Sequence, residues 1–318
     1  MNIGINGFGR IGRTFYRAND GKFAVAAIND LGDVANLKYL LKYDTVYGIY
    51  DKECDAKFVA EKEPEKLPWT DMKVDIVLES TGFFTKKEGA SKHISAGAKK
   101  VIISAPSDDA DVVIIPGIND EAYNPADHNV ISMGSCTTNC IVPLVKVIND
   151  NFKILKGSFT TTHSYTSTQA LVDKPEMEDY RRGRSGAENI VPTTTGAAKA
   201  IFQIFPELRG KIDALSARVP TPTVSLVDFV CEVEKETTKE EVNQKFEDAV
   251  GTMNGAIAVT HEPLVSTDLR GNPNASILDA ELTSVTDKHL IHVISWYDNE
   301  MGYSHRLVKL VELVASKL

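Results

Sequence analysis

The chain has 318 residues, which is long for one hydrophobic core and sufficient for two domains. Its composition, 42% hydrophobic and 25% charged, is typical of a soluble globular protein. A net charge of −9 gives no overall electrostatic reason to bind nucleic acid or an anionic membrane, so we expect neither as a partner.

Cysteine usage and the first residues set the expected compartment. Four cysteines are too few for a disulfide scaffold and predict free thiols in a reducing environment. The N-terminal residues enter a strand-and-turn pattern at once, which is not typical of a secretory leader. No apolar run approaches the ~18 residues of a membrane span. We therefore expect a cytoplasmic protein.

The first 135 residues alternate short apolar runs with helical patterns. Strands are predicted at residues 2–7, 23–30, 74–81, 99–106, 111–117 and 129–134. Helices are predicted at residues 10–20, 33–44 and 86–97. Alternation of this kind indicates a parallel sheet with helices on both faces. Near Ser135 the strand–helix alternation ends and longer strands with fewer helices begin, which predicts a domain boundary and gives domains 1–135 and 136–300.

The second part of the chain has fewer helices and longer, alternating strands. A helix at about residues 138–151 precedes strands predicted at residues 158–166, 213–220, 224–234, 276–285 and 289–298. This pattern predicts an α+β domain with a mostly antiparallel sheet. A polar, Arg-rich loop spans residues 172–196, and loops of this length are usually functional or disordered. An amphipathic helix is predicted at residues 301–318, with Leu307, Leu310, Val311, Val314 and Leu318 on one face.

A glycine pattern near the N-terminus predicts a dinucleotide site. Gly7, Gly9 and Gly12 form G-x-G-x-x-G between a predicted strand and a predicted helix. Such glycines allow a tight turn and let the backbone approach a pyrophosphate at the helix N-terminus. Asp30, at the end of the second strand, can accept the ribose hydroxyls of NAD and would repel the 2′-phosphate of NADP. The alternative is a surface turn with a helix-capping aspartate.

Cys136 lies among small and hydroxyl residues where a helical pattern begins. A thiol at a helix N-terminus is expected to have a lowered pKa and to form thiolate. Ser135, Thr137 and Thr138 offer hydroxyls and amides for an oxyanion or phosphate, and His163 could return to the same pocket as a proton acceptor.

Other interpretations of these two residues remain open from the sequence. A lone strand histidine such as His163 is more often a core residue than a catalyst. Cys136 and Cys140 with His163 suggest zinc only weakly, because C-x₃-C lacks a second clear pair. We expect no metal site and interpret Cys140 as a packing residue.

Six motifs occur in order along the whole chain: INGFGRIGR, SCTTNC, HSYT, PTTTGAAKA, RVPTP and SWYDNEMGYSHR. Together they closely resemble phosphorylating, NAD-dependent glyceraldehyde-3-phosphate dehydrogenases. The resemblance implies a Rossmann-type doubly wound sheet, completed by the helix at 301–318, plus a C-terminal α+β catalytic domain. It also implies a homotetramer in which the loop at about residues 172–191, followed by Pro192, reaches a neighbouring subunit.

The resemblance further implies a reaction. Cys136 adds to the aldehyde of glyceraldehyde 3-phosphate, and His163 acts as general base and, once protonated, supports the thiolate. The adduct then gives hydride to NAD, and inorganic phosphate attacks the resulting thioester to give 1,3-bisphosphoglycerate. The implied cofactor residues are Gly7, Phe8, Gly9, Arg10, Ile11, Gly12, Asp30, Lys62, Thr81, Gly82, Ser104, Asn299 and Tyr303.

The same resemblance implies sites for two anions. Thr166 and Arg218 match the site for the phosphate of the substrate. The site for the attacking phosphate matches Ser135, Thr137, Thr195 and Gly196, with Arg182 as a helper. Alternatively, the arginines of the loop form a solvated face or a subunit contact, and the threonines before Gly196 cap the next helix.

Rival functions and one departure from the family complete the expectations. Erythrose-4-phosphate dehydrogenase shares the cofactor pattern and the Cys–His pair, but favours hydrolysis of the thioester. A non-catalytic NAD-binding or RNA-binding protein and a thiol acyltransferase are more distant alternatives. The segment after Tyr50 is shorter than in most family members and carries Lys62 at a usual arginine position, which affects the adenosine side of the pocket.

Overall fold

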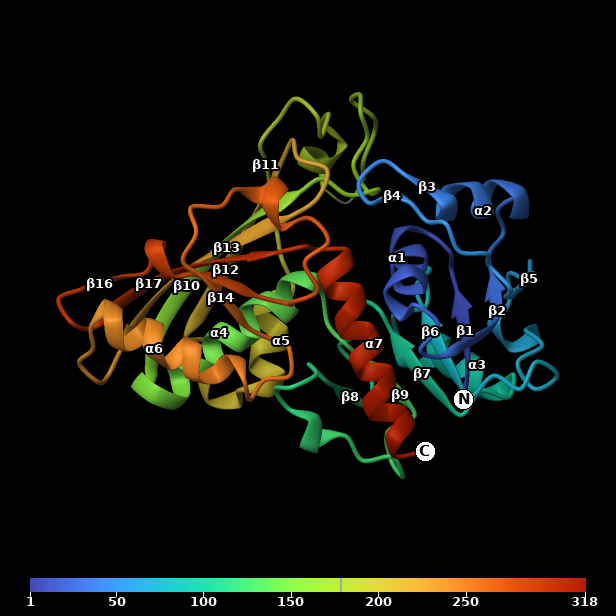
Figure 1. Cartoon of the computed structure of the whole chain (residues 1–318), viewed down its shortest axis with the longest axis horizontal. Helices are drawn as coiled ribbons and strands as arrows, with labels where there is room; N and C mark the ends of the chain where they lie inside the picture. The colour runs from blue at the N-terminus through green and yellow to red at the C-terminus, as the bar shows by residue number, and fades with distance from the viewer. Residues whose placement is uncertain (178) are drawn as a thin grey trace. The chain divides into compact units, whose positions relative to one another are not determined.

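The computed structural model describes residues 1–177 and 179–318, so Glu178, within the Arg-rich loop, lies outside the described residues. Contacts divide the chain into two units. The first unit comprises Met1–Ser135 with Ser304–Leu318, and the second comprises Cys136–Tyr303 (Figure 1).

The first unit is built on a seven-stranded sheet in the order β5-β2-β1-β6-β7-β9-β8. Every pairing in it is parallel. The strands are β1 Asn2–Asn6, β2 Ala24–Asn29, β5 Lys57–Val59, β6 Ile76–Glu79, β7 Lys100–Ile103, β8 Val112–Val113 and β9 Val130–Ser132. The predicted doubly wound sheet is confirmed. The central strands β6 and β7 are buried along their whole length, as expected for a sheet covered on both faces.

Three helices of this unit follow strands in the chain. They are α1 Arg10–Asn19, α2 Val34–Lys42 and α3 Lys87–Ser95. A two-stranded hairpin, β3 Tyr43–Asp44 with β4 Gly48–Ile49, follows α2. The edge strand β5 was not predicted, because the segment that contains it is short and rich in charged residues.

The C-terminal helix α7, Met301–Ser316, supplies an apolar face to the first unit. Leu307, Leu310, Val311 and Val314 are fully buried, as predicted, but Leu318 lies beyond the helix end and is 46% exposed. A hydrogen bond between the hydroxyls of Ser304 and Thr14, 2.7 Å long, ties α7 to α1.

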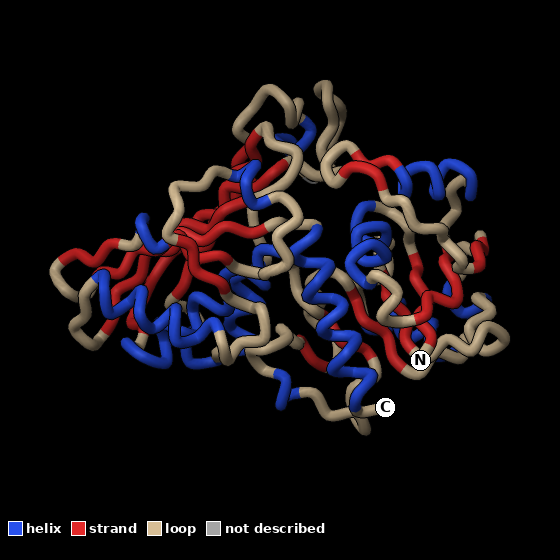
Figure 2. Tube along the Cα trace, in the orientation of Figure 1, coloured by secondary structure: helices blue, strands red, loops and turns tan. Residues whose placement is uncertain are grey.

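The second unit contains a sheet in the order β11-β12-β10-β13-β17-β15-β14, with β16 paired to β17. Its strands are β10 Ile154–Ser164, β11 Val191–Thr193, β12 Ile212–Val219, β13 Ser225–Val233, β14 Ala258–Thr260, β15 Ile277–Asp279, β16 Ser284–Thr286 and β17 Leu290–Tyr297. Pairing is mostly antiparallel, as predicted, with parallel pairs β10–β12 and β14–β15. Figure 2 shows these strands and the helices beside them.

Two local predictions for this unit need correction. The strand predicted at residues 276–285 is two short strands, because the chain turns at Ala280–Leu282 after Asp279 accepts a hydrogen bond from the Trp296 indole. Helix α6, Lys239–Val250, was missed. Its signal was present, because the Thr238 hydroxyl caps the helix by accepting from the Glu241 amide.

The remaining helices of the second unit are α4 Cys136–Phe152 and α5 Ala197–Ile204. Helix α4 begins two residues before the predicted start, so Cys136 is its first residue. This position places the thiol directly at the helix N-terminus.

Candidate active site

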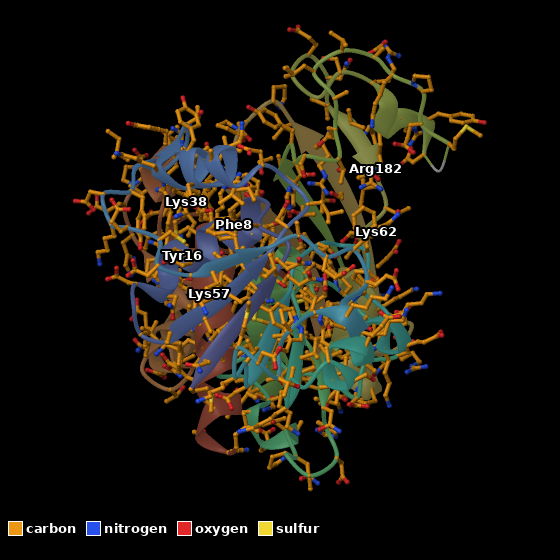
Figure 3. The ribbon with its side chains drawn as sticks, turned by 90° about the vertical axis from the view of Figure 1, so that its right-hand side faces the viewer. Phe8, Tyr16, Lys38, Lys57, Lys62 and Arg182 are labelled. Atoms are coloured by element: carbon orange, nitrogen blue, oxygen red, sulfur yellow. The ribbon has the colours of Figure 1, made fainter. Side chains whose placement is uncertain are left out.

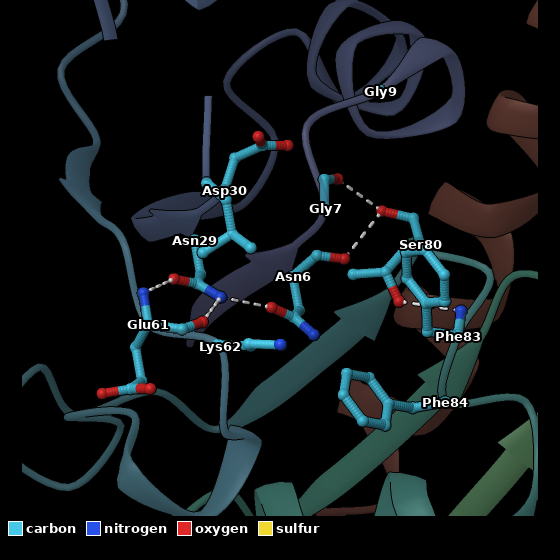
Figure 4. A pocket seen from close by; sticks show the side chains of 12 residues that line it. Asn6, Gly7, Gly9, Asn29, Asp30, Glu61, Lys62, Ser80, Phe83 and Phe84 are labelled. Carbon is cyan, nitrogen blue, oxygen red and sulfur yellow. Dashed lines mark hydrogen bonds between the residues drawn. The ribbon is translucent and has the colours of Figure 1, made fainter. Parts of the chain in front are cut away.

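A cavity of about 570 Å³ opens in the first unit (Figure 4). It is lined by Asn6, Gly7, Gly9, Asn29, Asp30, Leu31, Glu61, Lys62, Ser80, Thr81, Phe83 and Phe84. Asn6 ends β1, Asn29 ends β2, and Ser80 follows β6, so the cavity lies at the carboxyl ends of parallel strands. Ligands bind at this edge of open α/β sheets.

The three glycines fit a dinucleotide for different reasons. Gly7 has φ +91°, and a Cβ there would lie 2.7 Å from the Thr81 nitrogen. A Cβ on Gly12 would lie 2.3 Å from the Gly7 oxygen, so α1 and the turn can touch only without a side chain. A Cβ on Gly9 would meet nothing within 4 Å, which leaves that backbone open to a ligand.

The Asp30 carboxylate is fixed at the cavity wall. Its Oδ2 accepts from the Phe8 amide at 2.7 Å, and its Oδ1 accepts from the Gly32 amide at 2.8 Å. Phe8 contributes this amide only, because its side chain is fully buried against Tyr16, with ring centroids 6.0 Å apart (Figure 3). The anchored carboxylate retains lone pairs for ribose hydroxyls.

Some of the other predicted cofactor residues line the cavity, and others lie outside its lining. Thr81 and Lys62 line the cavity, and the Lys62 side chain extends into it (Figure 4). The predicted cofactor residues outside this lining are Phe8, Arg10, Ile11, Gly12, Gly82 and Ser104 of the first unit, and Asn299 and Tyr303 of the second. The Arg10 guanidinium pairs with Asp44, so only the backbone of Arg10 is available at the start of α1.

Sequence reasoning missed several polar wall residues, among them Asn6, Asn29 and Glu61. A usable signal existed for the two asparagines, since each is a polar residue at the carboxyl end of a buried strand. Phe83 and Phe84 had no comparable signal.

The second unit brings Cys136 and His163 together. Cys136 begins α4 and is half-buried, while His163 lies on β10 and is 3% exposed. The Cys136 Sγ and the His163 Nε2 are 3.3 Å apart, which is hydrogen-bond distance for a thiol. His163 is therefore not an isolated core histidine, because its ring contacts the Cys136 thiol.

The other ring nitrogen of His163 has two competing neighbours. Nδ1 lies 2.7 Å from the Ser164 carbonyl oxygen and 2.7 Å from Nη1 of Arg218. A carbonyl only accepts and a guanidinium only donates, so Nδ1 can satisfy one of them at a time. With its proton on Nδ1 toward Ser164, the ring presents the Nε2 lone pair to Cys136, which is the form that can accept a proton.

The predicted pKa of the nucleophile was wrong in direction. Burial raises the pKa of Cys136 above the usual thiol value, although the Arg218 charge and hydrogen bonds from the Thr137 amide and hydroxyl oppose this effect. The helix N-terminus therefore acts as expected but is outweighed by desolvation.

The surroundings of His163 determine its charge at rest. Burial, followed by the charge of Arg218, lowers the pKa of His163 to about 3. The resting pair near neutral pH is consequently a neutral imidazole beside a largely protonated thiol. An anion bound at Arg218 would offset the charge that suppresses the imidazolium.

Replacing Arg218 with glutamine is expected to move the alkylation of Cys136 to higher pH. The guanidinium lowers the pKa of this thiol, so its loss leaves the effect of burial less opposed. Iodoacetamide labelling rates between about pH 6 and pH 10, read by mass spectrometry, measure the shift. Arg218→Lys keeps the charge and serves as the control, and an unmoved profile in Arg218→Gln contradicts the prediction.

Arg218 and His163 face each other in the paired strands β12 and β10. The predicted anion residue Thr137 is buried, with its hydroxyl 2.9 Å from the Tyr297 hydroxyl. Arg182 acts electrostatically on Arg218, so both arginines belong to one region of positive charge.

The remaining predicted anion residues lie in turns and at helix starts. Thr166 has its hydroxyl 3.0 Å from that of Thr168. Gly196 is the N-cap of α5 and offers no side-chain hydrogen bond, and the Thr195 hydroxyl just before it accepts from the Ala197 amide at 3.2 Å. Ser135 immediately precedes the nucleophile in the chain.

Asn299 has its side chain held in one orientation. Its Oδ1 accepts from the Ser164 hydroxyl at 2.9 Å and from the Ser225 hydroxyl at 3.1 Å. The amide nitrogen is then the end of the group that can donate to a ligand. Tyr303 is 4% exposed, and burial raises its pKa well above the usual phenol value.

Neither a metal-binding cluster nor a membrane-spanning helix is present among the described residues. Within residues 1–177 and 179–318, no group of three or more His, Cys, Asp and Glu side chains is arranged to hold a metal ion. In the same ranges, none of the helices combines the length and apolar character needed to cross a membrane. Cys140 is fully buried beside Ser276, and burial raises its pKa to about 12, as suits a packing residue.

The fold and the site point to a class of protein: an oxidoreductase with a dinucleotide-type cavity in its first unit and a paired cysteine and histidine in its second. Comparison with protein families gives the specific assignment. Residues 1–87 match the NAD-binding domain of glyceraldehyde 3-phosphate dehydrogenase, and residues 135–299 match its C-terminal domain.

Curated relatives agree over the full chain. Glyceraldehyde-3-phosphate dehydrogenase of Priestia megaterium is 51% identical, that of Geobacillus stearothermophilus is 50% identical, and glyceraldehyde-3-phosphate dehydrogenase 1 of Bacillus subtilis is 50% identical. Each alignment covers 100% of this chain and 99% of the relative. The chain belongs to the glyceraldehyde-3-phosphate dehydrogenase family and is an NAD-dependent oxidoreductase. Nothing in these comparisons supports the erythrose-4-phosphate alternative.

Proposed function

We propose that this protein oxidises glyceraldehyde 3-phosphate to 1,3-bisphosphoglycerate with inorganic phosphate, reducing NAD. The observation that carries the proposal is the 3.3 Å separation of the Cys136 Sγ and the His163 Nε2 in a chain of this family. NAD, when bound, supplies the hydride acceptor.

Cys136 and His163 carry the covalent steps. The Cys136 sulfur bonds to the aldehyde carbon, and its thiol proton passes to the carbonyl oxygen to give a hemithioacetal. His163 Nε2 then takes the hydroxyl proton as the hydride leaves, which produces a thioester on Cys136. Phosphate oxygen attacks the thioester carbon, the carbon–sulfur bond breaks, the acyl phosphate departs, and the proton held by His163 returns to the Cys136 sulfur.

The arginines and hydroxyls supply anion binding in this scheme. Arg218 and Thr166 hold the phosphate of the aldehyde substrate, and Arg182 assists. Ser135, Thr137, Thr195 and Gly196 receive the attacking phosphate. Phosphate bound at Arg218 also removes the main charge that disfavours protonation of His163, so substrate binding favours proton uptake by the base.

Asn299 orients the nicotinamide. Because Ser164 and Ser225 fix its Oδ1, its amide nitrogen is available to the carboxamide oxygen of the cofactor. Through this contact Asn299 would hold the carboxamide of the bound cofactor, and Tyr303, buried in α7, follows four residues later in the chain.

The test is NADH formation with and without inorganic phosphate. We expect sustained turnover that requires both glyceraldehyde 3-phosphate and phosphate, and a single burst without phosphate because the thioester accumulates. Steady NADH formation that is indifferent to phosphate contradicts the phosphorylating step and favours hydrolysis. Erythrose 4-phosphate, assayed in parallel, is expected to react more slowly.

Changing Asp30 to asparagine is expected to weaken NAD binding about tenfold, the effect of losing one or two charge-assisted hydrogen bonds. Discrimination against NADP should narrow at the same time, because the carboxylate no longer repels the 2′-phosphate. Calorimetric titration with both dinucleotides measures the two effects. An unchanged ratio of NAD to NADP affinity contradicts the assigned role.

The assembly and the compartment follow from exposed apolar side chains and composition. In the Arg-rich loop, Val172 is 74% exposed, Tyr180 is 81% exposed and Ile190 is 71% exposed. Side chains of this kind mark protein contacts, so we infer a cytoplasmic homotetramer with this loop at an interface. Sedimentation equilibrium should give four times the chain mass, and Tyr180→Asp should shift it toward smaller species.

A further inference from the structure

A buried carboxylate lies directly behind the cofactor cavity. Glu79, at the end of β6, is 2% exposed. Its Oε2 accepts from the Asn6 side-chain amide at 2.6 Å, and its Oε1 accepts from the Thr81 backbone amide at 2.8 Å and from the Thr81 hydroxyl. Asn6 and Thr81 both line the cavity, so this single carboxylate holds two of its polar wall residues.

His93 and Trp69 hold the carboxylate from the other side. His93, on α3, is fully buried, and its Nε2 lies 3.0 Å from Glu79 Oε2. Trp69 is also fully buried, and its Nε1 lies 3.0 Å from His93 Nδ1. An indole N–H only donates, so Nδ1 must accept, the ring proton is on Nε2, and His93 donates to Glu79.

The chain of hydrogen bonds continues along the wall. Asn6 Oδ1 accepts from the Asn29 side-chain amide at 2.6 Å (Figure 4). Asn29 in turn bonds both the amide and the carbonyl of Glu61, each at 2.8 Å. A continuous chain of hydrogen bonds therefore connects the Trp69 indole, through His93 and Glu79, to the residues that line the cavity.

We propose that Trp69 and His93 are positioning residues for NAD: they fix the Glu79 carboxylate and so set Asn6 and Thr81 in the cofactor cavity. A neutral side-chain amide could rotate by half a turn and exchange donor for acceptor. A carboxylate held by four donors cannot, and it forces Asn6 to present Oδ1 toward Asn29. The proposal rests on the assignment of this cavity to NAD and is independent of the aldehyde substrate.

His93 variants test the proposal. His93→Gln keeps a side-chain N–H near the position of Nε2, whereas His93→Leu removes the donor at similar volume. We expect His93→Leu to weaken NAD binding about tenfold by calorimetry and to raise KM for NAD, with kcat at saturating NAD within about twofold of wild type. His93→Gln should recover most of the affinity.

Tryptophan variants provide a matched pair, because the chain has two tryptophans. Trp69→Phe removes the donor to His93. Trp296→Phe removes an indole bond to a carboxylate in the second unit, where Nε1 lies 3.1 Å from Asp279 Oδ2. Trp69→Phe should weaken NAD binding several-fold, and Trp296→Phe should not change it. If His93→Leu does not fold, the NAD affinities of Trp69→Phe and His93→Gln are compared instead.

The outcomes separate this inference from the assignment of the cavity. Absence of NAD binding in the wild type overturns the assignment of the cavity itself. Wild-type affinity in folded His93→Leu and Trp69→Phe, or equal losses in His93→Gln and His93→Leu, overturns the positioning role. If these residues had a purely structural role, the variants would have a lower Tm, and KM for NAD would not change selectively while kcat stays constant. Unchanged iodoacetamide labelling of Cys136 shows that the second unit remains intact.

Discussion

Cys136→Ser should reduce turnover at least about 10⁴-fold, because a serine hydroxyl in this position is a far weaker nucleophile than sulfur and has no strong base to activate it. The local conditions add to this effect. Burial raises the pKa even of the Cys136 thiol, so a serine hydroxyl, a much weaker acid, ionises far less at the same place. The measurement is NADH absorbance in the presence of glyceraldehyde 3-phosphate and phosphate.

The chain provides a control for this variant in the same helix. Cys140→Ser changes a fully buried thiol one turn along α4, beside Ser276, and should leave the rate within a few-fold of wild type. Cys136→Ser should still bind NAD, because the cavity is lined by residues of the first unit. Residual turnover in Cys136→Ser near the wild-type rate would falsify the assignment of the nucleophile.

His163→Asn is expected to lower kcat by about 10²- to 10⁴-fold, the usual range for loss of a general base. The Nε2 that faces Cys136 at 3.3 Å is lost, so the hydroxyl proton of the adduct has no acceptor during hydride transfer. His292→Asn is the control, because His292, on β17, pairs with Asp228, on β13, and its loss should not affect the rate.

The pH dependence gives a second readout for the same base. A base must be deprotonated to act, and a pKa of about 3 keeps His163 deprotonated above about pH 4. The acidic limb of kcat/KM should therefore show no step near the usual histidine pKa of about 6.5. Rates should instead rise toward alkaline pH as Cys136, whose pKa is raised by burial, ionises. A histidine-like step that disappears in His163→Asn would contradict this account of the resting site.

Local patterns were reliable where chemistry and backbone geometry coincide in a short segment. The glycine turn before α1, the aspartate at the end of β2 and the cysteine at the start of α4 each follow from neighbouring residues. Helix α6 was equally local and was missed although Thr238 and Glu241 signalled it. These features depend on propensity and capping, which act over a few residues.

Long-range features were not accessible in this way. Trp69, Glu79 and His93 form no motif, and only the packing of α3 beside the sheet brings their polar atoms together. The ionisation of the active site was predicted with the wrong sign for the same reason. A helix N-terminus is visible in a sequence, but the loss of water around Cys136 and the strand pairing that brings Arg218 to His163 are not.

The sequence alone therefore determined the fold class, the cofactor and the family resemblance, and it predicted the NAD site and the nucleophile, since each is encoded by residue types at short spacing. The tertiary structure decided how the nucleophile and the base are charged at rest. It also decided which residues line the cavity of the first unit and which of them a buried carboxylate hydrogen-bonds. Desolvation and hydrogen-bond direction depend on everything that surrounds a group, and residues distant in the chain supply those surroundings.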